Sequence, residues 1–268
     1  MKKDRFISNN IACDVFSGET PDGNQKNAVY FYGFPGSTGQ TIVTDFLVNL
    51  GFVAIQPHYP GTYESDGKHT PQSAIKSLKE INQIVENCKL KNVKSLKPVH
   101  LSSNIEVCVG NSFGAFVALR GASYLSKLKT LILLAPAISY GVNGKGCVIN
   151  EDGDSHYEYV KRSRPYAYRL GSKEEWLMLY EGKLDFLQKS EHPSLERVIG
   201  VIGTNDSSID IKRLRKFFKE VVTYYVGDRV EIDLLEVQGA GHSANTLLQK
   251  DISEKLSRKI LKSGFEND

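Results

Sequence analysis

The residue of this sequence most suited to chemistry is a serine between two glycines, in the run from Gly110 to Gly114 (G-N-S-F-G). An apolar run typical of a strand, residues 104–109, precedes it, and the apolar spacing and alanines of residues 115–120 predict a helix after it. Between a strand and a helix, G-x-S-x-G predicts a nucleophile elbow, a sharp turn that exposes the hydroxyl of Ser112. The pattern alone is weak evidence, because an ordinary glycine-rich turn has the same form.

Two residues farther along the chain can complete this chemistry. A serine hydroxyl hardly ionises at neutral pH, so it needs a neutral imidazole to take its proton and a carboxylate to orient that imidazole. Asp206 follows the apolar run 197–203, which predicts a buried strand, and His242 follows the alternating strand predicted at 230–237. The sequence therefore predicts that Ser112, Asp206 and His242 act together as nucleophile, acid and base.

Asp210 is a second candidate for the acid. It comes four residues after Asp206, at the start of the next predicted helix, where an aspartate side chain commonly caps free N–H groups. Asp228 and Asp233 fit a turn and a solvent-facing position of the last predicted strand. We therefore expect Asp206 to be the acid and keep Asp210 as the alternative.

The order serine, acid, histidine, with each residue after its own strand, resembles the α/β-hydrolase family. Residues 28–37 (A-V-Y-F-Y-G-F-P-G-S) are similar to the family's oxyanion loop, H-G-F-P-G-S, and residues 51–67 to the strand and loop that follow it. The resemblance extends from about residue 28 to the end of the sequence. Tyr32 stands where many members have the histidine of the H-G pair, and His58 and Pro60 replace the usual aspartate and arginine. These departures fit peptidase-like and esterase-like branches about equally, and the resemblance as a whole extends to esterase, lipase and S9-like peptidase branches.

The acyl-transfer intermediate needs two fixed hydrogen-bond donors for its oxyanion. We expect one to be the backbone N–H of Phe113, at the start of the helix after the serine, where free N–H groups and the helix dipole favour an anion. The other is expected to be the N–H of Phe34, because Pro35 in the same loop has none. The phenol of Tyr32 is a third candidate.

The alternation of strands and helices predicts an α/β fold, with a mostly parallel central sheet of about eight strands and helices on both faces. Since 268 residues of this class commonly form one unit, we expect residues 1–268 to be a single α/β-hydrolase domain. The expected strands are 28–32, 52–56, 104–109, 130–134, 197–203 and 230–237, and the expected helices lie near 39–50, 71–88 and 115–120.

Residues 137–196 interrupt this alternation, directly before the strand of the acid. In the family this is the usual place for a cap or lid over the active site, so the resemblance implies one here. The segment contains Trp176, the only tryptophan, and six of the 13 tyrosines, which either line a pocket or anchor the cap. Arg162, Arg164 and Arg169 could hold the carboxylate or phosphate of a peptide or carrier thioester, or could simply form a solvated face.

The composition excludes several other classes of function. The net charge is only +3, and the basic residues between 212 and 219 fit the wet face of an amphipathic helix, so we expect no nucleic-acid partner. The four cysteines form no C-x-x-C pair, which argues for a reducing compartment and against a metal site. No apolar stretch resembles a secretory signal or approaches the ~18 residues of a membrane span. We therefore expect a cytoplasmic protein that needs no cofactor; its oligomeric state is open.

Taken together, these residues predict a serine hydrolase that cleaves an ester, thioester or amide of a small or medium acyl substrate through an acyl-enzyme, as an esterase or thioesterase does. An acyltransferase, in which an alcohol or amine replaces water, is the alternative within enzymes. A ligand-binding protein that has kept the fold but lost turnover is the alternative from another class.

Overall fold

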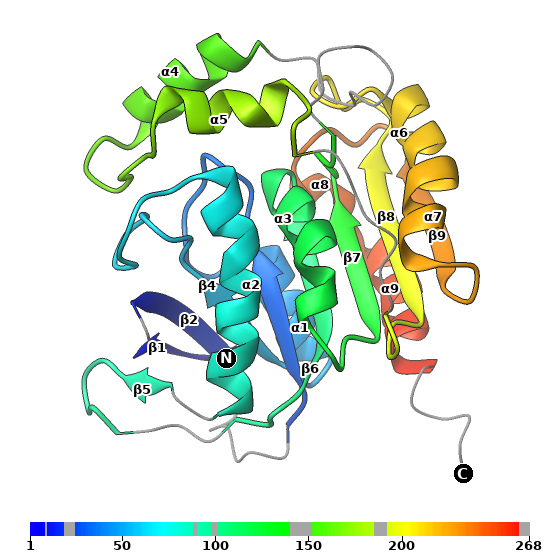
Figure 1. Ribbon diagram of the computed structural model, residues 1–268. Coiled ribbons are helices and arrows are strands. Elements are labelled where there is room, and N and C mark those ends of the chain that lie inside the picture. Colours follow the sequence, from blue (N-terminus) through cyan, green and yellow to red (C-terminus); the bar gives the residue numbers. More distant parts are fainter. Residues whose placement is uncertain are drawn as a thin grey trace.

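A sheet of nine strands forms the centre of the described part of the chain, in the order β5-β1-β2-β4-β3-β6-β7-β8-β9 (Figure 1). The computed structural model describes residues 1–8, 10–18, 25–87, 90–97, 101–139, 152–184 and 192–262. The strands are β1 (Lys2–Ser8), β2 (Ile11–Ser17), β3 (Asn27–Phe31), β4 (Val53–Pro57), β5 (Lys91–Asn92), β6 (Ile105–Asn111), β7 (Thr130–Leu134), β8 (Arg197–Gly203) and β9 (Glu231–Val237).

The strands from β3 onward, apart from β5, are parallel to one another, whereas β1, β2 and β5 pair antiparallel. This confirms the predicted mostly parallel sheet, in which β3, β4 and β7 are buried on both faces. The sheet has one strand more than the eight or so that we expected. A two-residue strand such as β5 is too short to leave a period in the sequence, so no pattern predicts it.

Helices cover both faces of the sheet. They are α1 (Ile42–Asn49), α2 (Pro71–Glu86), α3 (Phe113–Gly121), α4 (Gly153–Ser163), α5 (Lys173–Tyr180), α6 (Ile211–Phe217), α7 (Thr223–Val226), α8 (Ala244–Leu247) and α9 (Lys250–Lys262), and a π-helical turn (Phe218–Val222) joins α6 to α7. Figure 1 shows α2 and α3 in front of the sheet and α1 and α9 behind it. The starts of α1, α2 and α5 are fixed by capping boxes, in which Thr41, Thr70 and Ser172 bond the N–H three residues later.

The segment predicted as a cap contributes α4 and α5, which lie above the carboxyl ends of the parallel strands (Figure 1). Of residues 137–196, the structure describes 137–139, 152–184 and 192–196, so Tyr140 lies outside the described residues. Trp176 on α5 is almost completely buried, as are Tyr157 and Tyr180, whereas Tyr166 is fully exposed. Some tyrosine side chains of this segment are therefore buried in its packing, and others are exposed to solvent.

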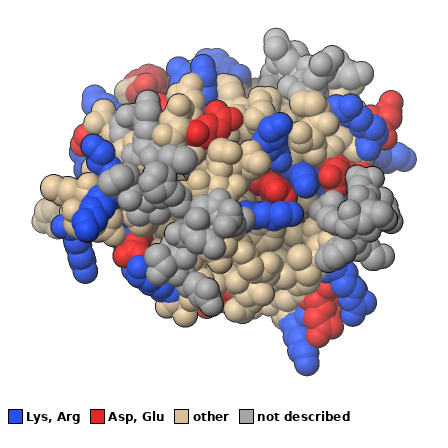
Figure 2. All heavy atoms as spheres, turned by 90° about the horizontal axis from the view of Figure 1, so that it is seen from below, with Lys and Arg blue, Asp and Glu red and all other residues tan. Residues whose placement is uncertain are grey.

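Charges of both signs are interspersed on the face opposite α4 and α5, as Figure 2 shows. At the amino ends of β3, β6 and β7, for example, Lys26 and Lys129 both pair with Glu106, at 3.2 and 3.4 Å. No helix within the described ranges is long and apolar enough to cross a membrane.

Candidate active site

Ser112 occupies a strained turn between β6 and α3. Its φ of 52° and ψ of −120° lie outside the regions that residues other than glycine usually adopt. A Cβ on Gly114 would lie 2.0 Å from the carbonyl oxygen of Phe31, and one on Gly110 would lie 2.3 Å from the carbonyl oxygen of Gly114. The turn that exposes this serine therefore requires glycine at both positions of the G-x-S-x-G pattern.

The structure brings Ser112, His242 and Asp206 into one hydrogen-bonded chain. His242 Nε2 lies 2.9 Å from Ser112 Oγ, and its Nδ1 lies 2.8 Å from Asp206 Oδ2. The three residues follow β6, β9 and β8, whose carboxyl ends meet at the same edge of the sheet. A Cβ on Gly203 would lie 2.1 Å from the carbonyl oxygen of Ala240, so the acid and histidine loops approach closely at a glycine.

Asp206 is held in place by its own loop. Its side chain is only 1% exposed, and Oδ1 accepts hydrogen bonds from the N–H groups of Ser208 and Ile209, at 2.9 and 3.1 Å. Oδ2 is thereby directed at His242. With the Nδ1 proton donated to this carboxylate, Nε2 is the ring nitrogen that can accept the proton of Ser112.

Asp210, the alternative acid, does not reach the histidine. Its side chain caps α6 by accepting hydrogen bonds from the N–H groups of Lys212 and Arg213, at 3.0 and 3.1 Å. Asp210 therefore caps the start of a helix, as the sequence indicated.

The expected oxyanion donors lie on either side of the serine. Phe113 is the first residue of α3, and the loop of Phe34 packs so closely that a Cβ on Gly33 would lie 3.2 Å from Ser112 Cβ. Among the described residues, neither the N–H of Phe34 nor that of Phe113 donates a hydrogen bond. Both N–H groups therefore have no acceptor within the described part of the chain, as the expected oxyanion donors require.

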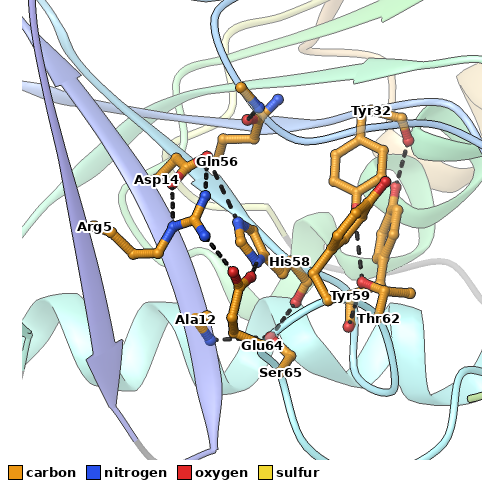
Figure 3. Close-up of polar contacts among 12 residues, drawn as sticks. Arg5, Ala12, Asp14, Tyr32, Gln56, His58, Tyr59, Thr62, Glu64 and Ser65 are labelled. Carbon is orange, nitrogen blue, oxygen red and sulfur yellow. Dashed lines mark hydrogen bonds and ion pairs between the residues drawn. The ribbon is translucent and has the colours of Figure 1, made fainter. Parts of the chain in front are cut away.

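The phenol of Tyr32 is directed elsewhere. It lies 3.3 Å from Thr62 Oγ1 in a buried position, and the Tyr59 hydroxyl donates to the Tyr32 carbonyl at 2.7 Å (Figure 3). Burial raises the pKa of this phenol well above its ordinary value. Because this hydroxyl is engaged with Thr62 in a buried position, the contact argues against Tyr32 as a third donor. The direction of its side chain depends on how residues 59–62 pack, which no local pattern reveals.

A cavity of about 510 Å³ opens above Ser112 and His242. No Asp, Glu, Lys or Arg is found among the described residues that line it. The segment predicted as a cap supplies Tyr159, one of the tyrosines considered for the pocket, and His156, which sequence analysis did not assign to the site. The other lining residues are Tyr30, Gly33, Phe34, Pro35, Thr41, Ile42, Asn111, Ala137, Ser208, Ile209, Ser243, Ala244 and Asn245.

The three arginines considered as anion ligands lie away from this cavity. Arg169 donates to the backbone carbonyls of Ser65 and, at 3.2 Å, of Tyr63, and Arg162 donates to the carbonyl of Glu158 at 3.1 Å. Arg164 is exposed and is not one of the described lining residues. The structure therefore does not bring these cations to Ser112. In the part of the chain that it describes, no group of three or more His, Cys, Asp or Glu side chains could hold a metal ion.

Solved structures share this fold over nearly their whole length. A monoacylglycerol lipase from Paleococcus ferrophilus matches with a TM-score of 0.55 and 18% identity, over 94% of this chain and 97% of the lipase. Esterase 2 of Thermogutta terrifontis, solved after phosphonylation by sarin, matches at 0.59 and 14%, over 96% and 92%. The esterase Pf2001 of Pyrococcus furiosus matches at 0.58 and 16%, over 98% and 92%. No protein-family model and no curated protein matches the sequence. The chain has the α/β-hydrolase fold, which confirms the predicted fold class.

Proposed function

We propose that this protein is a serine hydrolase that cleaves a carboxylic ester, thioester or amide through an acyl-enzyme intermediate. The observation that carries the proposal is the hydrogen-bonded chain from Ser112 through His242 to Asp206, at 2.9 and 2.8 Å, on the floor of a cavity. A purely binding role does not require a strained serine, a histidine and a buried carboxylate in this arrangement.

In the first half of the proposed reaction, Ser112 Oγ attacks the acyl carbon while His242 Nε2 takes the serine proton. The carbonyl oxygen becomes an oxyanion, which the N–H groups of Phe34 and Phe113 stabilise. His242 then gives the proton to the leaving alcohol, thiol or amine, and the acyl group remains on Ser112.

In the second half, water takes the place of the leaving group. His242 removes a proton from the water as it attacks the acyl carbon, and then returns that proton to Ser112 Oγ as the acid product leaves. Asp206 keeps Nδ1 protonated throughout and stabilises the imidazolium that forms in each half. An acyltransferase would use the same residues, with an acceptor alcohol or amine in place of water.

The structural neighbours support the same class of reaction. They are named as a monoacylglycerol lipase and as esterases, and one was solved with an organophosphorus group attached.

The test is intact mass after exposure to a fluorophosphonate, a reagent that phosphonylates activated serines. We expect one adduct on the wild-type protein, none on Ser112→Ala, and one on the control Ser126→Ala, which removes an exposed serine that is not among the described lining residues of the cavity. An adduct on Ser112→Ala, or none on the wild type, would contradict the proposal. The latter result would favour the ligand-binding alternative. Turnover of esters, thioesters and aminoacyl amides then identifies the bond that is cleaved.

A further inference from the structure

One glycine of the loop that carries Phe34 is held by two tyrosine hydroxyls. The Gly36 N–H donates to the hydroxyl oxygen of Tyr168 at 2.9 Å, and the same hydroxyl donates to the carbonyl oxygen of Gly36. The hydroxyl of Tyr63 donates to that carbonyl as well, at 2.7 Å. Both polar backbone groups of Gly36 are thus fixed by side chains from outside the loop.

Gly36 in turn abuts the peptide unit that carries the expected oxyanion donor. A Cβ at this position would lie 2.1 Å from the carbonyl oxygen of Gly33. That carbonyl and the N–H of Phe34 belong to one planar peptide group, so they move together. A shift of Gly36 therefore turns the Phe34 N–H relative to Ser112.

The two tyrosines come from segments that are joined by backbone hydrogen bonds. Residues 61–69, after β4, pair with residues 167–171, between α4 and α5, through an antiparallel bridge of Thr62 with Tyr168 and a parallel bridge of His69 with Leu170. The N–H of Tyr63 donates to the carbonyl of Ala167 at 2.7 Å. The segment predicted as a cap is therefore attached to the body beside the oxyanion loop.

Residues 58–65, which carry Tyr63, are themselves held in place by contacts with β1 and β2. In Figure 3, Asp14 on β2 accepts from Arg5, and His58 lies between Asp14 and Glu64, with its Nδ1 3.0 Å from Glu64 Oε2. Ser65 accepts from the N–H of Ala12 at 2.9 Å. These contacts attach residues 58–65 to the antiparallel strands and give Tyr63 a rigid base.

Aromatic packing adds a second link between the same segments. The ring of Phe34 lies 4.6 Å from that of Tyr168 and 4.1 Å from that of His69, between centroids. Trp176 on α5 stacks on both Phe34 and Phe113, at 5.6 and 6.2 Å. Burial lowers the pKa of His69 to about 3, so its ring is neutral near pH 7 and packs as an uncharged partner.

We propose that Tyr168 is a positioning residue for the oxyanion hole, acting through Gly36 on the N–H of Phe34. The inference rests on the proposed function, and it gives the segment between α4 and α5 a part in catalysis beyond covering the site. Tyr63 acts on the same carbonyl with one hydrogen bond, whereas Tyr168 makes two.

The test uses Tyr168→Phe, which keeps the ring against Phe34 and removes only the hydroxyl. With a 4-nitrophenyl ester, we expect kcat to fall about tenfold, KM to stay within about twofold, and the rate of phosphonylation by a fluorophosphonate to fall with kcat, since both steps place an oxygen in the oxyanion hole. The midpoint of the pH–rate profile should not move, because His242 and Asp206 are untouched. Tyr63→Phe should lower kcat by about threefold, and Tyr166→Phe, at a fully exposed tyrosine, should match the wild type.

A folded Tyr168→Phe protein with wild-type kcat and phosphonylation rate would overturn the inference. So would a rise in KM with an unchanged phosphonylation rate, because the hydroxyl would then serve substrate binding. If Tyr168→Phe does not fold, Tyr63→Phe decides: a lower kcat at constant KM supports the inference and unchanged kinetics overturns it. A wild-type protein without Ser112-dependent labelling would overturn the proposed function itself, and the inference with it.

Discussion

The carboxyl group of Asp206 accepts three hydrogen bonds, two from its own loop and one from His242. The two hydrogen bonds from the loop fix the orientation of the carboxylate independently of its contact with His242. In the proposed reaction, Asp206 therefore sets the tautomer and orientation of the imidazole, which a neutral amide of the same shape cannot do.

Replacing Asp206 by asparagine should consequently lower kcat by roughly 10³- to 10⁴-fold with little change in KM. The matched control is Asp210→Asn, four residues away, where asparagine is an equally good helix cap and activity should be retained. Steady-state kinetics with one activated ester measures both variants. Loss of activity in Asp210→Asn with retention in Asp206→Asn would reverse the assignment.

Sequence position was sufficient to bring together Ser112, Asp206 and His242, because residues that follow parallel strands share one edge of a sheet. It was not sufficient for side chains whose direction depends on a loop or on a long connection. Tyr32 was a third candidate donor, but its phenol lies against Thr62. His156 and Tyr168 take their places from the packing of residues 152–184.

Among the elements, the junction of β6 with α3 leaves the least room for change. The position of a Cβ on Gly114 is 2.0 Å from a backbone oxygen of β3, which cannot swing away as a side chain would. Gly114→Ala should therefore distort the turn that holds Ser112, lowering kcat at least about 100-fold and the free energy of unfolding by about 2 kcal/mol.

The control for this variant is Gly18→Ala, where the nearest atom of the described residues to the new Cβ is a methyl group of Val48 at 4.0 Å. Kinetics and urea unfolding should show Gly18→Ala close to the wild type. An active and stable Gly114→Ala protein would mean that strand and helix can separate without loss of the turn.

The antiparallel strands depend on a buried charge. Asp14 on β2 has a fully buried side chain. Although burial opposes its ionisation, the neighbouring His58, Arg5 and Lys3 outweigh burial and hold its pKa below the usual range. A lowered carboxyl pKa stabilises the folded protein at pH values above the ordinary pKa near 4, and this stability is lost as the pH falls below it.

Asp14→Asn should accordingly lower the free energy of unfolding by about 3 kcal/mol at pH 7, because it leaves the cations without their partner. The difference in free energy of unfolding between Asp14→Asn and the wild type should be smaller at pH 3, where the ionised Asp14 carboxylate stabilises the wild-type protein less. Urea unfolding at both pH values measures this, with Asp228→Asn, at an exposed aspartate, as the control. An equal difference at both pH values would contradict the electrostatic explanation.

The parallel strands lie where the sequence predicted them. Burial on both faces imposes a continuous apolar run on β3, β4, β7 and β8, whereas β9 at the edge of the sheet alternates. The two elements that the sequence did not predict, β5 and the π-helical turn, impose no comparable pattern on their residues. β5 pairs through only two residues, and the π-helical turn Phe218–Val222 interrupts what the amphipathic pattern presents as one continuous helix.

For the molecule as a whole, the cavity limits which acyl groups fit. Its described lining offers hydroxyl, amide, imidazole and apolar groups but no Asp, Glu, Lys or Arg, so an anionic acyl group entering it leaves water without gaining an ionic partner. We expect kcat/KM for 4-nitrophenyl butyrate to exceed that for 4-nitrophenyl hemisuccinate, which has an acyl chain of the same length, by at least about tenfold, or about 1.4 kcal/mol. Equal values would mean that a cation reaches the acyl group in the working enzyme.

The strand order also has a consequence for the protein while it is being made. A chain leaves the ribosome from its amino end, and the strands that surround Ser112 (β3, β4, β6 and β7) are complete before β8 and β9 are added at one edge of the sheet. His242 follows Ser112 by 130 residues, which takes roughly ten seconds to synthesise. During that interval the nascent chain holds its nucleophile without a base. The proposed activity therefore requires β8 and β9, and its appearance during translation would report that this edge of the sheet is in place.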